Sequence, residues 1–213
     1  MSPLRGFGPL GLAAIALILA GNLLFLPLSA LLVLAWAQAS GTPWPEIGFV
    51  RPRSWTRSIL IGIAFGALFK LAMKAIVMPL LGAPPVNARY HYLAGNAAAL
   101  PGMLYAVIIG AGFGEETVFR GYMFERLGKL LGQTTREKVA TVLITATVFA
   151  AAHYPDQRIP GVEQAAFTGL AFGGIYAVTG ELFMLMVAHA TFDLVALALI
   201  YWNLEAKVAH LFF

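Results

Sequence analysis

Residues 100–120 read LPGMLYAVIIGAGFGEETVFR, an apolar run followed by two adjacent acids, Glu115 and Glu116. Placing one ionised side chain at the centre of a membrane helix costs roughly 2.5 to 3.5 kcal/mol. A chain rarely keeps two such acids side by side unless they have a use. We therefore interpret the pair as part of a functional site, and we predict that about residues 98–129 form a membrane helix.

The composition also favours a membrane protein. Of the 213 residues, 60% are apolar and only 11% are charged, whereas an ordinary soluble domain carries about 25% charged residues. Mean hydropathy is +0.79. We expect a single membrane domain over residues 1–213, in the plasma (inner) membrane of a prokaryote. The absence of cysteine excludes disulfides, thiolate metal sites and a cysteine nucleophile.

The positive net charge of +4 does not indicate nucleic-acid binding. Most basic residues lie between the apolar runs, as expected for loops that flank membrane helices. Lys70 and Lys74 are exceptions, because they lie four residues apart within an apolar run. We expect these two lysines to reach toward the membrane surface or to line a wet groove. The predicted partners are therefore the lipid bilayer and a substrate, with no nucleic acid.

The apolar runs predict an all-α, polytopic bundle of about six to eight transmembrane helices with an intramembrane polar cavity. A membrane-spanning helix needs about 20 predominantly apolar residues. The first run, about residues 10–37, is interrupted by Asn22 and Pro27, and it could form one kinked helix or a broken pair. The later runs cover about residues 58–81, 98–129, 138–153, 161–178 and 181–201.

The two acids have different local surroundings. Glu116 and Arg120 are four residues apart and share a helix face, so they can form a buried ion pair. Taken alone, that pair could be purely structural. Glu115 points about a third of a turn away and has no local partner. Three nearby glycines, at positions 110, 112 and 114, would let a neighbouring helix or a substrate backbone approach closely.

Two later apolar runs supply further polar side chains. His153 ends the run at about residues 138–153, and His189 lies four residues before Asp193 in the last run. At a rise of about 1.5 Å per residue, Glu115 and His153 lie at similar depths on antiparallel neighbouring helices. We predict that these residues converge on the polar cavity. Taken alone, His153 could be a capping residue, and His189 a hydrogen-bonded core residue.

Several kinds of protease do not fit these residues. The serines, at positions 2, 29, 40, 54 and 58, are far in sequence from both histidines, which weakens a serine–histidine mechanism. Asp193 has no second membrane-embedded aspartate to form an aspartyl dyad. The chain also lacks a His-Glu-x-x-His zinc motif. A glutamate combined with imidazoles remains, and these groups can activate water and stabilise an oxyanion.

Three motifs together resemble those of a known family. Glu115-Glu116-x-x-x-Arg120, Phe149-x-x-x-His153 and His189-x-x-x-Asp193 occur in this order on successive apolar segments. This pattern resembles the CAAX protease and bacteriocin-processing (CPBP, or Abi) family of intramembrane proteases, which includes the type II CAAX prenyl endopeptidase. The resemblance covers about residues 98–202, and we expect this region to be the catalytic core.

The resemblance implies a role for each motif residue. It makes Glu115 the general base, with His153 orienting the hydrolytic water. His189 and the residue at position 193 stabilise the oxyanion, while Glu116 and Arg120 support the site. The family often has asparagine where this chain has Asp193, and a carboxylate cannot donate a hydrogen bond unless it is protonated. This departure makes a metal-ligand or histidine-orienting role more plausible for Asp193.

Metal dependence stays open at this stage. Glu115, His153 and His189 are an adequate set of zinc ligands with an open fourth position. The alternative is a metal-free mechanism in which Glu115 takes the proton directly from water. The assignment of a base role to Glu115 favours the metal-free mechanism.

We therefore predict a CAAX-type intramembrane endopeptidase. It hydrolyses a peptide bond near the C-terminus, or in a membrane segment, of a membrane-associated peptide or protein, with Glu115 and His153 activating water. One branch of the resembled family implies a prenylated substrate. The main alternative is a non-proteolytic scaffold or bacteriocin-immunity-type protein on the same fold. A proton-coupled carrier that uses Glu115 and the histidines as a relay is a further alternative.

Overall fold

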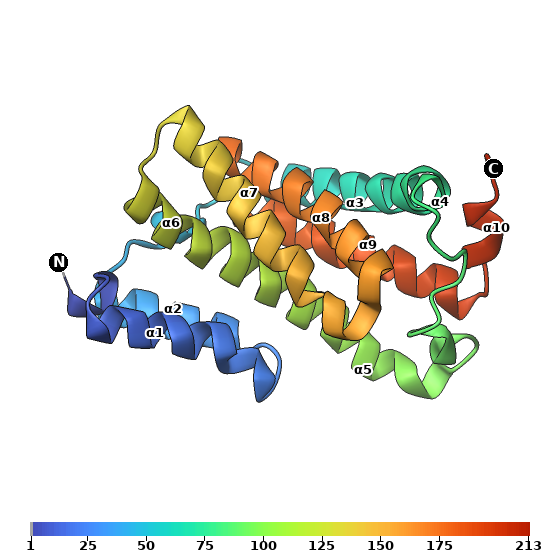
Figure 1. The fold of residues 1–213 in the computed structure, drawn as a ribbon, viewed down its shortest axis with the longest axis horizontal. Helices are drawn as coiled ribbons and strands as arrows, with labels where there is room; N and C mark the ends of the chain where they lie inside the picture. The colour runs from blue at the N-terminus through green and yellow to red at the C-terminus, as the bar shows by residue number, and fades with distance from the viewer. Residues whose placement is uncertain (1) are drawn as a thin grey trace.

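The computed structural model describes residues 2–213, and the regular structure within that range is entirely helical, as predicted. Ten α-helices follow one another along these residues (Figure 1). They are α1 (Pro9–Ala20), α2 (Leu28–Ser40), α3 (Trp55–Ala72), α4 (Met78–Leu80), α5 (Leu100–Tyr105), α6 (Met123–Leu131), α7 (Thr135–Ala152), α8 (Tyr154–Thr179), α9 (Leu182–Tyr201) and α10 (Glu205–Ala209). Two π-helical segments join neighbours, Met73–Val77 between α3 and α4 and Ala106–Tyr122 between α5 and α6.

Three helices in the described residues are long and apolar enough to cross a membrane. They cover Trp55–Leu80, Ala97–Leu131 and Leu182–Tyr201. The helices Pro9–Leu23 and Leu28–Ser40 are apolar but shorter. An α-helix of 13 residues reaches only about 20 Å, less than the roughly 30 Å of the hydrocarbon core. The predicted count of six to eight transmembrane helices is therefore not confirmed.

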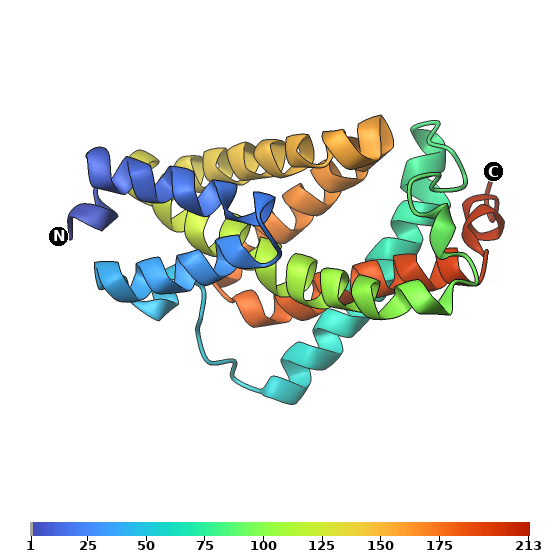
Figure 2. The same cartoon turned by 90° about the horizontal axis from the view of Figure 1, so that it is seen from below.

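The first apolar run is a broken pair of helices. α1 and α2 lie side by side, as Figures 1 and 2 show, and a short turn joins them. Two reciprocal hydrogen bonds fix this turn: the backbone N–H of Asn22 donates to Ser29 Oγ, and the backbone N–H of Ser29 donates to Asn22 Oδ1, both at 2.9 Å. Asn22 therefore satisfies backbone groups that the interruption of the helix leaves unpaired.

Helix α9 packs between α3 and the π-helical segment, which carry glycines at the contacts. A Cβ added at Gly62 of α3 would lie 2.8 Å from Val187 Cβ. A Cβ added at Gly112 would lie 2.9 Å from Ala190 Cβ. Any larger side chain at either position would push the helices apart. The close packing holds α9 at a fixed depth against both neighbours, and the predicted role of Gly112 agrees with it.

Helices α7 and α8 form an antiparallel pair (Figure 2). The pair covers one side of the helix Ala97–Leu131, which is called the long central helix below. His153 caps α7, and the chain reverses over the next residues. Arg158 has φ of 55° there, a left-handed conformation that interrupts the helical path before Pro160. This reversal places His153 at the corner between two helices.

Candidate active site

Glu116 joins the π-helical segment to α9 through one carboxylate oxygen. Glu116 Oε1 accepts hydrogen bonds from Arg120 Nη1 at 2.8 Å and from His189 Nδ1 at 2.6 Å. All three side chains are almost fully inaccessible to solvent. Hydrogen bonds between ionised partners are short and strong, so Glu116 fixes the orientation of the His189 ring. Because Nδ1 is used in this way, Nε2 is the ring nitrogen available for chemistry.

Two carboxylates face that free nitrogen. His189 Nε2 lies 3.8 Å from Glu115 Oε2 and 3.8 Å from Asp193 Oδ2. Both distances exceed those of a direct hydrogen bond and leave room for a small group between the partners. Glu115 Oε2 is buried, and it makes no hydrogen bond to another residue in the range 2–213. Glu115 is therefore positioned toward His189 without being held by it.

His153 is oriented through its own helix. Its Nδ1 donates to the backbone carbonyl of Phe149 at 2.8 Å, which leaves Nε2 as an acceptor. The Phe149 ring packs edge-on against the His153 ring, with centroids 4.7 Å apart. The same ring lies 4.7 Å from the Arg120 guanidinium carbon and 6.1 Å from the His189 ring centroid. Phe149 thus lies between three of the predicted polar residues.

A cavity of about 370 Å³ brings the predicted residues together. Four of them line it: Glu115, His153, His189 and Asp193. Glu116 and Arg120 do not line the cavity, and they lie behind the His189 ring. Most of the remaining wall is apolar, so interactions between charges in this cavity are stronger than in water. The three motifs therefore contribute side chains to one site, although their distances in sequence are long.

The carboxylate that orients His189 differs from the expected one. The sequence suggested that Asp193, one turn away on the same helix, could hold the ring. The structure instead gives this role to Glu116 on the π-helical segment, with a hydrogen bond of 2.6 Å to Nδ1. Asp193 lies 3.8 Å from Nε2, beyond hydrogen-bond distance. The residue that fixes the His189 ring in this geometry is therefore Glu116.

The described side chains offer no three-ligand set for zinc. Among residues 2–213, no group of three His, Cys, Asp or Glu side chains is placed to hold a metal ion. The zinc set of Glu115, His153 and His189 therefore stays a prediction.

The cavity also contains polar residues that the sequence did not assign to the site. Lys70 of α3 and Gln164 of α8 line it, and Lys70 Nζ donates to Gln164 Oε1 at 2.7 Å. The expectation that Lys70 lines a groove agrees with this position. Gln164 had no sequence signal, because a single polar residue in an amphipathic run is more often exposed.

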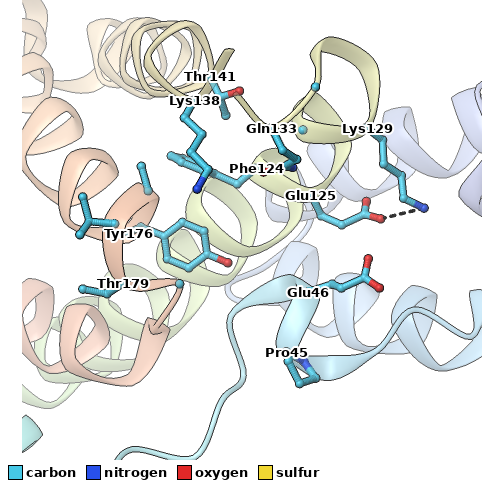
Figure 3. Close-up of a pocket in the computed structure, with 15 residues that line it drawn as sticks. Pro45, Glu46, Phe124, Glu125, Lys129, Gln133, Lys138, Thr141, Tyr176 and Thr179 are labelled. Carbon is cyan, nitrogen blue, oxygen red and sulfur yellow. Dashed lines mark ion pairs between the residues drawn. The ribbon is translucent and has the colours of Figure 1, made fainter. Parts of the chain in front are cut away.

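A second cavity, of about 470 Å³, lies at the other end of the long central helix (Figure 3). It is bordered by α6, α7 and the end of α8, and it contains none of the predicted site residues. Glu125 lies on its wall and is ion-paired with Arg5 at 3.0 Å, Lys129 at 3.3 Å and Arg126 at 3.4 Å. Figure 3 shows the Glu125 carboxylate turned toward Lys129.

The comparison with protein families agrees with the three motifs. Residues 97–195 match the family model described as Type II CAAX prenyl endopeptidase Rce1-like. Over these residues the chain is similar to that family. The match includes all six predicted site residues and confirms the resemblance to CAAX proteases. No curated protein and no solved structure matches the chain.

The match to the Rce1-like family model covers only part of the helical assembly. It begins just before α5 and ends within α9, so helices α1 to α4 lie outside the matched residues. α3 nevertheless packs along α9 and contributes Lys70 to the cavity. The wall of the site is therefore built from both the matched and the unmatched parts of the chain.

Proposed function

We propose that this protein is an intramembrane endopeptidase in which Glu115 activates water for attack on a peptide bond. The observation that carries this proposal is the state of Glu115. Its half-buried carboxylate lines the cavity, lies 3.8 Å from His189 Nε2, and makes no hydrogen bond through Oε2 to any residue of the described range. A free carboxylate in a mainly apolar cavity suits a general base. The Rce1-like match supports CAAX-type protease activity in general.

The first half of the reaction uses Glu115 and His153. Water binds between Glu115 Oε2 and His153 Nε2, which is free because Nδ1 is bonded to a backbone carbonyl. Glu115 takes a proton from this water, and the oxygen attacks the carbonyl carbon of the substrate. His153 orients the attacking lone pair.

The second half uses His189. In its protonated form, His189 donates from Nε2 to the oxyanion that develops on the substrate carbonyl, and the Glu116 carboxylate balances the charge of the ring. The C–N bond then breaks, and the proton held by Glu115 passes to the leaving amine. Glu116 and Arg120 act as positioning residues, because they reach the substrate only through His189.

The proposed substrate is a peptide or protein that is anchored in, or attached to, the bilayer. In the described residues, three helices are long and apolar enough to span a membrane, and each carries residues of the cavity, such as Lys70, Glu115 and His189. A lipid-modified segment, including a prenylated one, would reach such a site from the membrane. The protein is then an integral membrane protein, and we propose the plasma membrane of a prokaryote as its location.

The test compares membrane proteomes of cells that carry the parent protein or the Glu115→Ala variant, and then repeats any cleavage with purified protein in vesicles. We expect a set of membrane-associated proteins to remain uncleaved in the variant and a mass-resolved product with the parent. An unchanged proteome together with an unchanged phenotype would instead indicate a scaffold. Altered proton flux in vesicles without cleavage would indicate a carrier.

A further inference from the structure

Lys70 is a buried cation that forms no ion pair with any acid in the described part of the chain. Its exposed fraction is 7%, and it lines the same cavity as Glu115 and His189. Nζ donates to the neutral side chain of Gln164 and lies 4.7 Å from the centroid of the Phe192 ring. None of the ion pairs in residues 2–213 includes Lys70. An ammonium group has three N–H donors, so Lys70 retains donor capacity after its bond to Gln164.

Lys74, one turn further along the helix, provides a contrast. Its Nζ donates to the backbone carbonyl of Pro85 at 2.7 Å and lies 3.4 Å from Glu205 Oε1. Its charge is therefore already balanced by a carboxylate. Buried charges are normally paired, and only Lys70 of these two lysines departs from that rule.

Several other charged side chains lie around Lys70. Lys70 also borders an adjoining pocket of about 300 Å³ that is lined by further cations, Lys74, Arg89 and Arg158. Two acids of this pocket already have partners, since Arg89 pairs with Asp156 and Lys74 with Glu205. The acids Glu115 and Asp193 also line the main cavity, and neither forms an ion pair with Lys70. A ligand with one negative end would therefore find an unpaired cation at Lys70.

We propose, resting on the endopeptidase function above, that Lys70 binds the free C-terminal carboxylate of the peptide substrate. A C-terminal carboxylate is small enough to accept hydrogen bonds from Nζ, and it supplies the missing negative charge. Binding at Lys70 directs the chain of the substrate toward Glu115 and His153. The site thereby selects peptide bonds near a free C-terminus, and Lys70 is a specificity residue that lies outside the Rce1-like match.

The test uses one peptide in two forms. The probe is a farnesylated peptide with three residues after the modified cysteine, made with a C-terminal carboxylate or with a C-terminal amide. We measure kcat/KM for both forms with purified protein in neutral-lipid vesicles. A charge-assisted hydrogen bond predicts that the acid is cleaved roughly 10 to 100 times more efficiently than the amide. Lys70→Met should bring this ratio close to one, and Lys70→Arg should largely restore it.

The ratio is the informative quantity, because partial misfolding lowers both rates by the same factor. Lys74→Met is the matched control and should keep the ratio of the parent. A parent ratio near one, or an unchanged ratio in Lys70→Met, would overturn the carboxylate site while leaving the protease function in place. A Lys70 that holds a lipid phosphate instead would give this same unchanged ratio. Cleavage of neither form would count against the endopeptidase function itself.

Discussion

Two glutamates on the same long helix, the half-buried Glu115 and the buried Glu125, have opposite surroundings. Glu125 is ion-paired with three cations, one each from the N-terminal segment, from the neighbouring residue and from the next helical turn. Within residues 2–213, Glu115 forms an ion pair with His189 alone, at 3.8 Å. A cavity lies beside each of them, of about 470 Å³ at Glu125 and about 370 Å³ at Glu115. The presence of a cavity therefore does not distinguish the two acids.

The difference distinguishes an acid that stabilises the fold from an acid that can take part in a reaction. A carboxylate that already has several cationic partners gains little from an incoming substrate and cannot easily take up a proton. A carboxylate without such partners pays the cost of burial and remains reactive. The comparison thus assigns catalysis to Glu115 and assembly of the N-terminal segment to Glu125.

Removing the two acids separately gives the largest predicted difference. Glu115→Gln keeps the size of the side chain and removes the base, so cleavage should fall by roughly 10²- to 10⁴-fold. Glu125→Gln should leave kcat/KM within a few-fold of the parent. The measurement is the initial rate of product formation in vesicles, normalised to folded protein by size-exclusion chromatography. Equal rate losses in both variants would remove the distinction between the two sites.

Variants of His153 and His189 test the residues that act together with Glu115. His153→Ala and His189→Ala should each lower turnover by roughly 100-fold or more, because each removes a group that contacts the water or the oxyanion. Folding in detergent should be retained for His153→Ala, since that ring bonds only to its own helix. Unchanged turnover in either variant would exclude that histidine from the mechanism.

Thermal stability should depend more on Glu116 than on Glu125. Glu116→Gln leaves Arg120 and His189 buried at 2% and 6% exposure without a full counter-charge, and breaking such a pair costs about 3 to 5 kcal/mol. Glu125→Gln should cost less, because Lys129 is 24% exposed and can be rehydrated. Thermal unfolding in detergent measures both. A larger loss of thermal stability in Glu125→Gln would show that the central pair is not the stronger one.

Asp193→Asn should have the smallest effect. Asp193 lies 3.8 Å from His189 Nε2, beyond hydrogen-bond distance, and Glu116 holds the ring through Nδ1, so we expect the ring to keep its orientation. An amide at this position can donate to the oxyanion, whereas a carboxylate cannot. We expect kcat to stay within a few-fold of the parent or to rise. A loss of more than roughly 100-fold would show that the negative charge itself is needed.

The sequence predicts the candidate site better than it predicts the membrane architecture. Glu115, His153 and His189 could be selected because each is a polar residue in an apolar run, and that signal is local. The count of spanning helices was less predictable. Apolar content alone cannot distinguish one long helix from two short ones, and the break after α1 depends on hydrogen bonds between Asn22 and Ser29.

The pairing inside the site was also beyond the sequence. Helical spacing predicts the pair Glu116 and Arg120, which the structure contains. It equally predicts a contact between His189 and Asp193, yet the close partner of His189 is Glu116, 73 residues away in the chain. Such a choice depends on how α9 packs against the π-helical segment, and the spacing within one helix carries no information about it. The environment of Lys70 likewise depends on how the helices pack, which helical spacing does not predict.

The aromatic ring of Phe149 sets the separation of groups that carry charge around it. One apolar side chain contacts Arg120 and His153 and lies close to His189, and its own carbonyl anchors His153. A misplacement of about 1 Å among reacting groups can cost roughly 10²-fold in rate. A smaller side chain at position 149 would therefore displace the groups that we propose for hydrolysis, although every ionisable residue would still be present.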